Sequence, residues 1–126
     1  MAIKKMTRFF GKDVLTRRVL REVVCLRHLL DCPNIVEVIE FDVSFIEFNE
    51  VYLVLLACDA DMFQIIRSTQ ELTHSHIKYF LVQLLRAVHY MHTAHIVHRD
   101  LKPSNLLVNA NCTCLLYTSD AADEED

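Results

Sequence analysis

The chain contains a single glycine, Gly11, among its 126 residues. Average usage of roughly 7% would give about nine glycines at this length. Neither G-x-G-x-x-G nor G-x-x-x-x-G-K can be written with one glycine, so these residues contain no glycine-rich phosphate loop. The shortage also argues against an all-β fold with many tight turns, which depend on glycine. The length is that of one compact domain or of a piece of a larger one.

Charge is distributed unevenly along the chain. Seventeen acidic against thirteen basic residues give a formal net charge of −4, but five of the acids lie within residues 120–126. The remaining body is nearly neutral, so we expect no nucleic-acid partner. The five cysteines have no scaffold-like spacing, which favours free thiols in a reducing compartment. No apolar run is long enough to cross a membrane and no signal peptide is visible, so we expect no membrane partner and a soluble protein of the cytoplasm, with the nucleus as a second location.

Hydrophobic periodicity predicts a chain that changes character near residue 57. The first part alternates between strands and one helix, and the second part is mainly helical. This order indicates an α+β fold, in which a small sheet-bearing lobe precedes a helical lobe. Strands are expected at residues 2–6, 39–45, 51–56 and 106–108, and helices at 14–30, 62–67 and from Thr73 to about residue 92.

The same patterns predict which faces are buried. Asp13 and Thr73 are expected to act as helix N-caps, because their side-chain oxygens can accept from backbone N–H groups of the first turn. The alternating strand at 39–45 should be half-buried, and the continuous apolar strand at 51–56 should be buried on both faces. The long helix is expected to bury Ile77, Phe80, Leu81, Leu84, Val88 and Met91.

Residues 98–105, HRDLKPSN, carry most of the chemical information. They fit the pattern H-R-D-L-x-x-x-N of the protein-kinase catalytic loop. Asp100 can accept the proton of a substrate hydroxyl, and Asn105 offers an amide oxygen to Mg²⁺, which prefers oxygen ligands. Lys102 places a cation near the transferring phosphoryl group. Arg99 is expected to contact a phosphorylated activation segment.

A lysine and a glutamate complete this chemistry. The N-terminal residues MAIK resemble the kinase motif V-A-I-K, with Lys4 as the lysine that binds the ATP phosphates. Glu22 lies in the middle of the first predicted helix beside its apolar stripe, where an unpaired carboxylate would be costly. A Lys4–Glu22 ion pair would explain this position and would orient Lys4 toward phosphate.

With these matches the chain resembles the eukaryotic protein kinases, and more closely the mitogen-activated protein kinases. The resemblance covers about residues 1–113 and rests on AIKK, LTRRVLREVVCLRHL, FNEVYLVLL, DADMFQII and HIKYFLVQLLRAVHYMHTAHIVHRDLKPSNLLVN. It implies a truncated protein-kinase-like fold, with part of the small lobe at 1–56, a hinge at 57–60 and the start of the large lobe at 61–113. It also implies transfer of the ATP γ-phosphate to serine or threonine of proteins, with Mg²⁺ as cofactor.

The resemblance assigns further residues to the nucleotide site. Leu56, Ala57 and Cys58 would form the hinge that offers backbone groups to adenine. The other implied positions are the gatekeeper Leu55, the adenine roof Ala2, the adenine floor Leu107, Asp61 near the ribose and Ser104 on the phosphate side.

The resemblance also implies protein partners. These are protein substrates, an upstream activating kinase and linear docking-motif peptides. A hydrophobic groove for such peptides would involve Ile65, Leu72, His76 and Tyr79, although ordinary helix packing explains the same residues equally well.

Several features depart from the family pattern. No glycine-rich loop precedes Ala2, Leu55 replaces a more usual glutamine, and Thr118 stands where Asp-Phe-Gly should begin. Residues 114–124, CLLYTSDAADE, resemble a translated transposase adapter of sequencing libraries, so 114–126 is expected to be an artefactual tail without a role in the fold. The fragment alone is therefore expected to be inactive. The alternative function is a pseudokinase or docking module without catalysis.

Overall fold

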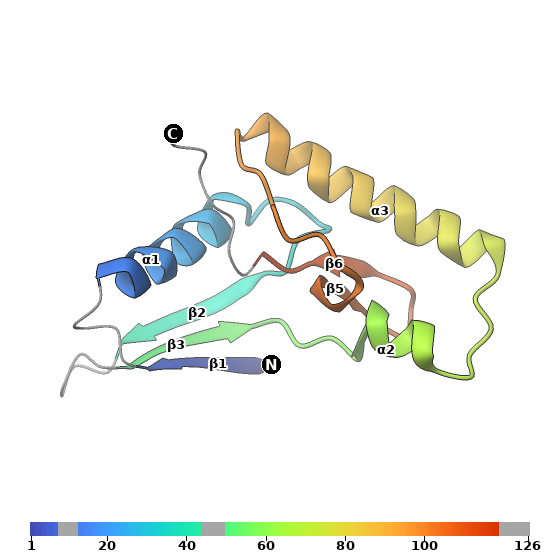
Figure 1. Ribbon diagram of the computed structural model, residues 1–126, viewed down its shortest axis with the longest axis horizontal. Coiled ribbons are helices and arrows are strands. Elements are labelled where there is room, and N and C mark those ends of the chain that lie inside the picture. The colour runs from blue at the N-terminus through green and yellow to red at the C-terminus, as the bar shows by residue number, and fades with distance from the viewer. Residues whose placement is uncertain (8–12, 44–49, 119–126) are drawn as a thin grey trace.

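The computed structural model describes residues 1–7, 13–43 and 50–118 (Figure 1). Two small sheets and three helices follow one another in an order that confirms the α+β fold class. In chain order the elements are β1 (Ala2–Thr7), α1 (Asp13–His28), β2 (Val38–Val43), β3 (Glu50–Leu55), β4 (Ala60–Asp61), α2 (Met62–Arg67), α3 (His74–Thr93), the 3₁₀ turn η1 (Pro103–Asn105), β5 (Leu106–Val108) and β6 (Cys114–Leu116).

The first sheet has the order β1-β3-β2, with both pairs antiparallel. Figure 1 shows α1 lying over one face of this sheet. Val23 of α1 packs there in one apolar cluster with Leu53 and Leu55. The expectation that the strand at 51–56 is buried on both faces is wrong: Tyr52 and Val54 on its other face are only half-buried. The reason is that α1 covers one side of the sheet only.

The strand β2 lies at the edge of the first sheet. Its apolar residues were expected to be half-buried, yet Ile39 is 46% and Phe41 39% exposed, while Phe45 lies outside the described residues. A register shift between Val38 and Glu40 explains the exposure of Ile39, because the extra residue of a bulge leaves the regular alternation of faces. Phe41 pairs with the buried Leu53 and therefore faces the same side, but it lies on an edge strand that leaves it partly uncovered. Val38, before the shift, packs against the apolar cluster.

The helix α3 packs against the second sheet, which has the order β4-β5-β6. Thr73 is its N-cap, as predicted, and accepts a bond from the His76 backbone. The predicted buried stripe is wrong at Ile77 and Leu81, each 51% exposed, because the helix instead turns Gln83 and other residues inward. No helix within the described ranges is both long and apolar enough to cross a membrane, α3 included. The buried residues of α3 are Phe80, Gln83, Ala87 and Met91.

The buried side chain of Gln83 explains this rotation of α3. Its Oε1 accepts from the amide of Asn34 at 3.2 Å and from the backbone N–H of Cys114 at 2.8 Å. Its Nε2 donates to the Cys112 carbonyl at 3.0 Å. A polar group is tolerated in a core when its hydrogen bonds are made. Gln83 thus joins α3 to β6 and to the turn after α1.

The strand β6 differs most from expectation. Its three residues, Cys114–Leu116, are all buried and pair with β5. The Leu116 N–H donates to the Asn34 carbonyl at 2.8 Å, and the Val36 N–H donates to the Leu116 carbonyl at 3.1 Å. The expectation of no fold role is therefore wrong for 114–118, because apolar residues after the turn at 109–113 complete a buried hairpin. The adapter origin stays a prediction, and 119–126 lies outside the described residues.

The lengths of the remaining elements agree closely with the periodicity. α2 has the expected bounds, and Asp61 caps it by accepting from the Gln64 backbone N–H at 2.7 Å. α1 begins at Asp13 itself, so Asp13 belongs to the helix instead of preceding it, and it ends at His28, before Pro33. A proline cannot continue the helical hydrogen-bond ladder.

Candidate nucleotide and phosphoryl-transfer site

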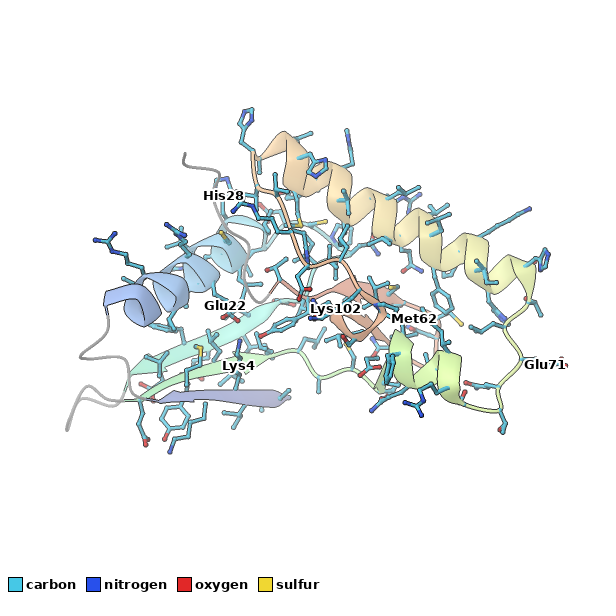
Figure 2. The ribbon with its side chains drawn as sticks, viewed as in Figure 1. Lys4, Glu22, His28, Met62, Glu71 and Lys102 are labelled. Atoms are coloured by element: carbon cyan, nitrogen blue, oxygen red, sulfur yellow. The ribbon has the colours of Figure 1, made fainter. Side chains whose placement is uncertain are left out.

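Lys4, Glu22 and Tyr117 form a hydrogen-bonded cluster between β1, α1 and the residue after β6. Lys4 Nζ donates to Glu22 Oε1 at 2.7 Å, to Glu22 Oε2 at 3.1 Å and to Tyr117 Oη at 2.8 Å. The Tyr117 hydroxyl donates to Glu22 Oε1 at 2.9 Å. The Glu22 side chain is only 5% exposed, against 34% for Lys4. In Figure 2 the labelled Lys4 and Glu22 lie between the first sheet and α1, so the predicted ion pair is present.

The protonation states of this cluster follow from its surroundings. Burial alone would lower the pKa of Lys4, but its hydrogen bonds to Glu22 and Tyr117 outweigh burial and raise that pKa. Burial raises the pKa of the Tyr117 hydroxyl, although the hydrogen bond from Lys4 acts in the opposite direction. At neutral pH Lys4 is therefore charged and Tyr117 neutral. This fixes Tyr117 as an acceptor from Lys4 and a donor to Glu22.

A cavity of about 370 Å³ opens beside this cluster, between the end of β3, the segment after it and β5. Its volume lies in the range of small-molecule sites. Lys4 and Glu22 are not in its wall, but their partner Tyr117 is. Ser104 lies exposed in η1 and is not part of the lining. The predicted residues that do line the cavity are Ala2, Leu55, Leu56, Ala57, Cys58, Asp61 and Leu107.

The segment after β3 gives this cavity an apolar wall. The Leu56 N–H donates to the Glu37 carbonyl at 3.0 Å, so this hinge amide serves the fold. Burial, and then the nearby charge of Asp59, raise the pKa of the Cys58 thiol, which is therefore uncharged. Val36, Gln64 and Tyr117 also line the cavity and had no predicted site role. The remaining lining residues, Asp59 and Ala60, lie within the hinge at 57–60 that the resemblance implied.

The catalytic-loop residues gather around Asp100. Lys102 Nζ lies 2.6 Å from Asp100 Oδ2, and Asn105 Nδ2 donates to the same oxygen at 3.0 Å and to the Asp100 carbonyl at 2.8 Å. The bond to Lys102, followed by that from Asn105, lowers the pKa of Asp100. The carboxylate is thus ionised and half-exposed, as a proton acceptor for an incoming hydroxyl must be.

His98 connects this loop to Tyr117. Its Nδ1 accepts from the Asp100 N–H at 3.2 Å, and its Nε2 donates to the Tyr117 carbonyl at 2.8 Å. These partners place a ring proton on Nε2 and leave Nδ1 as the acceptor. Arg99, between His98 and Asp100, has a positive φ of 61°, which is uncommon outside glycine and turns its side chain to solvent. The loop is therefore held by backbone conformation and by the buried imidazole.

The donor set for Mg²⁺ is incomplete. Asn105 uses Nδ2 on Asp100, so Oδ1 is the atom it could offer to a cation. Thr118 stands where a second carboxylate was expected; it is 1% exposed and its Oγ1 has no hydrogen-bond partner among the described residues. Residues 1–7, 13–43 and 50–118 contain no group of three or more His, Cys, Asp or Glu side chains suited to a metal. These residues do not form a Mg²⁺ site on their own.

A second cavity, of about 290 Å³, lies between α2, the start of α3 and β5. Of the residues predicted for a docking groove, Ile65, Leu72 and His76 line it. Tyr79 does not line the cavity and is 53% exposed. A cavity is therefore present where the docking groove was expected, but Tyr79 is not part of its wall.

Comparison with known proteins finds relatives among the plant mitogen-activated protein kinases. The rice (Oryza sativa subsp. indica) mitogen-activated protein kinase 5 is 48% identical over 114 residues, which are 89% of this chain and 31% of the rice protein. The tobacco (Nicotiana tabacum) mitogen-activated protein kinase homolog NTF6 is also 48% identical, and the Arabidopsis thaliana mitogen-activated protein kinase 6 is 46% identical, each over 89% of this chain. The chain spans under a third of the length of these relatives.

The family itself is identified by a match that covers nearly the whole chain. The family model of the protein kinase domain matches residues 1–117. This range contains the Lys4–Glu22 pair, the hinge cavity and the loop around Asp100. The chain therefore belongs to the protein kinase domain family.

Proposed function

We propose that this chain is the nucleotide-binding and catalytic-loop part of a mitogen-activated serine/threonine protein kinase. The observation that carries the proposal is the connection between two polar clusters. Lys4 and Glu22 bond to the side chain of Tyr117, while His98 of the catalytic loop bonds to the carbonyl of the same residue. The similarity to plant mitogen-activated protein kinases supports the serine/threonine specificity and the use of ATP and a divalent cation.

In this proposal the cluster around Lys4 acts on ATP, and the cluster around Asp100 acts on the substrate hydroxyl. Adenine occupies the cavity beside Leu55 and Leu107, and Lys4 binds the phosphates of ATP. The substrate hydroxyl oxygen forms a bond to the γ-phosphorus, the bond to the bridging oxygen breaks, and ADP leaves with that electron pair. The hydroxyl proton passes to the ionised Asp100 carboxylate. The charge of Lys102, 2.6 Å from Asp100, stabilises the transferring phosphoryl group.

A chimera tests the catalytic role of Asp100. In it, residues 1–113 replace the matched segment of the rice relative, which supplies the rest of the kinase. After the activation that the rice protein itself receives, we expect the chimera to transfer labelled γ-phosphate to a Ser/Thr-Pro peptide. Asp100→Asn should lower kcat by about 100-fold or more with little change in the KM for ATP, because Asp100 acts on the acceptor and not on the nucleotide.

The control for this experiment is Asp42→Asn, the same change at an exposed carboxylate of β2. It should leave kcat near that of the unmodified chimera. Near-normal turnover of Asp100→Asn would remove Asp100 from the mechanism. An inactive chimera that folds and binds ATP would favour the pseudokinase alternative.

The same proposal makes the 126-residue chain inactive alone. For Mg²⁺ its described residues offer the amide oxygen of Asn105 without the second carboxylate, and its sequence contains no glycine-rich loop. Incubation with labelled ATP and the same peptide should give no more product than an Asp100→Asn control of the same length. Transfer above that control would overturn this part of the proposal.

The cavity between α2 and α3 is the proposed site of docking-motif peptides. Leu72 contributes an apolar wall and is half-buried, as an anchor pocket requires. In the chimera, Leu72→Ala should weaken binding of a fluorescein-labelled apolar docking peptide about fivefold or more, whereas Tyr79→Ala, outside the lining, should not. Equal affinities for both variants would favour simple helix packing.

A further inference from the structure

All three donors of the Lys4 ammonium are already in use. A lysine ammonium carries three N–H donors and no acceptor. Lys4 directs these donors at Glu22 Oε1, Glu22 Oε2 and Tyr117 Oη, at 2.7, 3.1 and 2.8 Å. A phosphate oxygen that binds Lys4 must therefore displace one of these acceptors.

Tyr117 is the acceptor that can leave at the smaller cost. Glu22 is charged and 5% exposed, so removing its bonds to Lys4 would leave a buried carboxylate uncompensated. The Tyr117 hydroxyl is neutral and its side chain borders the 370 Å³ cavity, so the ring can withdraw toward open space. A ligand phosphate at Lys4 and the Tyr117 hydroxyl thus compete for one donor.

Two hydrogen bonds hold the backbone of Tyr117 next to Lys4. Its N–H donates to the Asn105 carbonyl at 2.9 Å, and its carbonyl accepts from His98 Nε2 at 2.8 Å. The ring lies with its centroid 5.4 Å from Lys4 Nζ. Because both backbone groups are held by the catalytic loop, only the side chain is free to yield to a ligand.

We propose that Tyr117 sets the ligand preference of the cavity, favouring uncharged nucleosides over nucleotides that carry phosphates. An uncharged nucleoside needs only the cavity wall, whereas ATP must also break the Lys4–Tyr117 bond. This inference rests on the proposed nucleotide site and deepens it by naming the ligand class. The inference applies to the chain as given, with tyrosine at position 117, and does not depend on the origin of residues 114–118.

A second cluster of the same composition provides a matched control. Lys5 Nζ lies 2.7 Å from Glu50 Oε1, Tyr52 donates its hydroxyl to Glu50, and the Tyr52 ring centroid lies 5.6 Å from Lys5 Nζ. None of these three residues lines the 370 Å³ cavity. Tyr52→Phe therefore removes the same chemical group as Tyr117→Phe, but at a position that does not line the cavity.

The test measures the dissociation constants of tritiated adenosine and of labelled ATP by equilibrium dialysis, with and without Mg²⁺, on the 126-residue chain. For Tyr117→Phe we expect the affinity for ATP relative to adenosine to rise about fivefold or more, because one Lys4 donor becomes free. The adenosine affinity should change by less than about twofold. Tyr52→Phe should leave both constants at their original values. These thresholds correspond to about 1 kcal/mol and 0.4 kcal/mol.

A ligand-free measurement checks the cluster itself. Trace acetylation followed by peptide mass spectrometry should show that Lys4 reacts more slowly than Lys5, and that Tyr117→Phe speeds the reaction of Lys4 alone. Equal rates for Lys4 and Lys5 in the unmodified chain would overturn the inference, since the cluster would not exist.

The outcomes separate this inference from the proposed function. Adenosine binding with an unchanged ATP preference in Tyr117→Phe overturns the inference alone. A shifted preference together with an inactive chimera overturns the proposed transfer activity alone. Absence of binding of either ligand to every variant counts against both the nucleotide cavity and the inference.

Discussion

Two adjacent lysines of β1, Lys4 and Lys5, make the same set of contacts on opposite faces of one strand. Successive side chains of a β-strand point to opposite sides of the sheet. Each lysine lies 2.7 Å from a glutamate oxygen and 5.4 or 5.6 Å from the centre of a tyrosine ring. The residue types are therefore the same in both clusters.

The surroundings of the two lysines differ. Lys5 meets Glu50 and Tyr52 on the neighbouring strand β3, and the lysine and glutamate side chains are 48% and 34% exposed. Lys4 meets Glu22 and Tyr117, which are 18 and 113 residues away in sequence. The cluster around Lys4 joins the sheet to α1 and to the catalytic loop, next to a cavity. Burial and long-range partners, rather than residue type, make one cluster a candidate site and the other a surface feature.

The largest expected difference between the clusters is the loss of a lysine. Lys4→Met leaves the buried Glu22 carboxylate unpaired, which should lower the free energy of unfolding by about 3 kcal/mol. Lys5→Met should change it far less, because that pair is exposed and water screens it. Urea unfolding followed by circular dichroism measures both changes. The protein concentration is kept low because the exposed Leu81 and Leu85 of α3 favour aggregation. Equal losses would contradict the comparison.

Removal of one glutamate charge should have the next largest effect. Glu22→Gln weakens charge-assisted bonds from Lys4 and Tyr117 in a buried position, at a cost of about 2 kcal/mol in unfolding free energy. Glu50→Gln, the matched change, should cost much less because water screens that pair. The same urea titration applies. A larger loss at Glu50 would reverse the assignment of the buried cluster.

Removal of one tyrosine hydroxyl should have a smaller effect than loss of a charge. Tyr117→Phe loses one bond to Lys4 and one to Glu22 and should lower the unfolding free energy by about 1 kcal/mol. Tyr52→Phe removes a partly exposed bond to Glu50 and should cost less than about 0.5 kcal/mol. Thermal unfolding midpoints rank the two variants, and an identical midpoint for both would contradict the expected order.

The smallest expected effect is a difference in alkaline stability. The pKa values of Lys4 and Tyr117 are both raised in the folded chain from ordinary values of 10.5 and 10.0. A raised folded-state pKa contributes stability that is fully present below the unfolded-state value and is lost as the pH rises through the folded-state value. The unfolding free energy should therefore fall above about pH 10.

The alkaline loss is assigned to the cluster around Lys4 by comparing variants. Lys4→Met should flatten the decline between pH 8 and pH 11 in urea titrations, since it removes one titrating group and the bond that couples it to Tyr117. Lys5→Met should flatten it less, although the pKa of Lys5 is also raised by Glu50 and Tyr52, because Lys5 remains in solvent. An identical decline in all three chains would contradict this assignment.

The parts of the site that lie in local motifs could be predicted from sequence. Asp100, Lys102 and Asn105 occur within six residues, and the structure brings them together within hydrogen-bond distance. The Lys4–Glu22 pair could be predicted because a carboxylate on the apolar side of a helix needs a partner. Their catalytic roles stay predictions until activity is measured.

Features that depend on tertiary packing could not be predicted in this way. Tyr117 was assigned to a tail without a fold role, although the apolar residues CLLY after a turn are typical of the second strand of a hairpin. The buried face of α3 includes Gln83 in place of the expected Ile77 and Leu81. The side-chain amide of Gln83 makes its hydrogen bonds with Asn34 and Cys114, which are far away in sequence. Periodicity alone does not reveal a polar residue that finds its partners only in the folded chain.

In the proposed function Lys4, and not its neighbour Lys5, serves the phosphoryl-transfer site. The most direct test is the rate of γ-phosphate transfer by the chimera carrying Lys4→Met or Lys5→Met, with folding checked by circular dichroism. We expect Lys4→Met to lower kcat/KM about 100-fold or more, and Lys5→Met to stay within about twofold of the unmodified chimera. Equal rates for the two folded variants, or a greater loss for Lys5→Met, would contradict this role of Lys4.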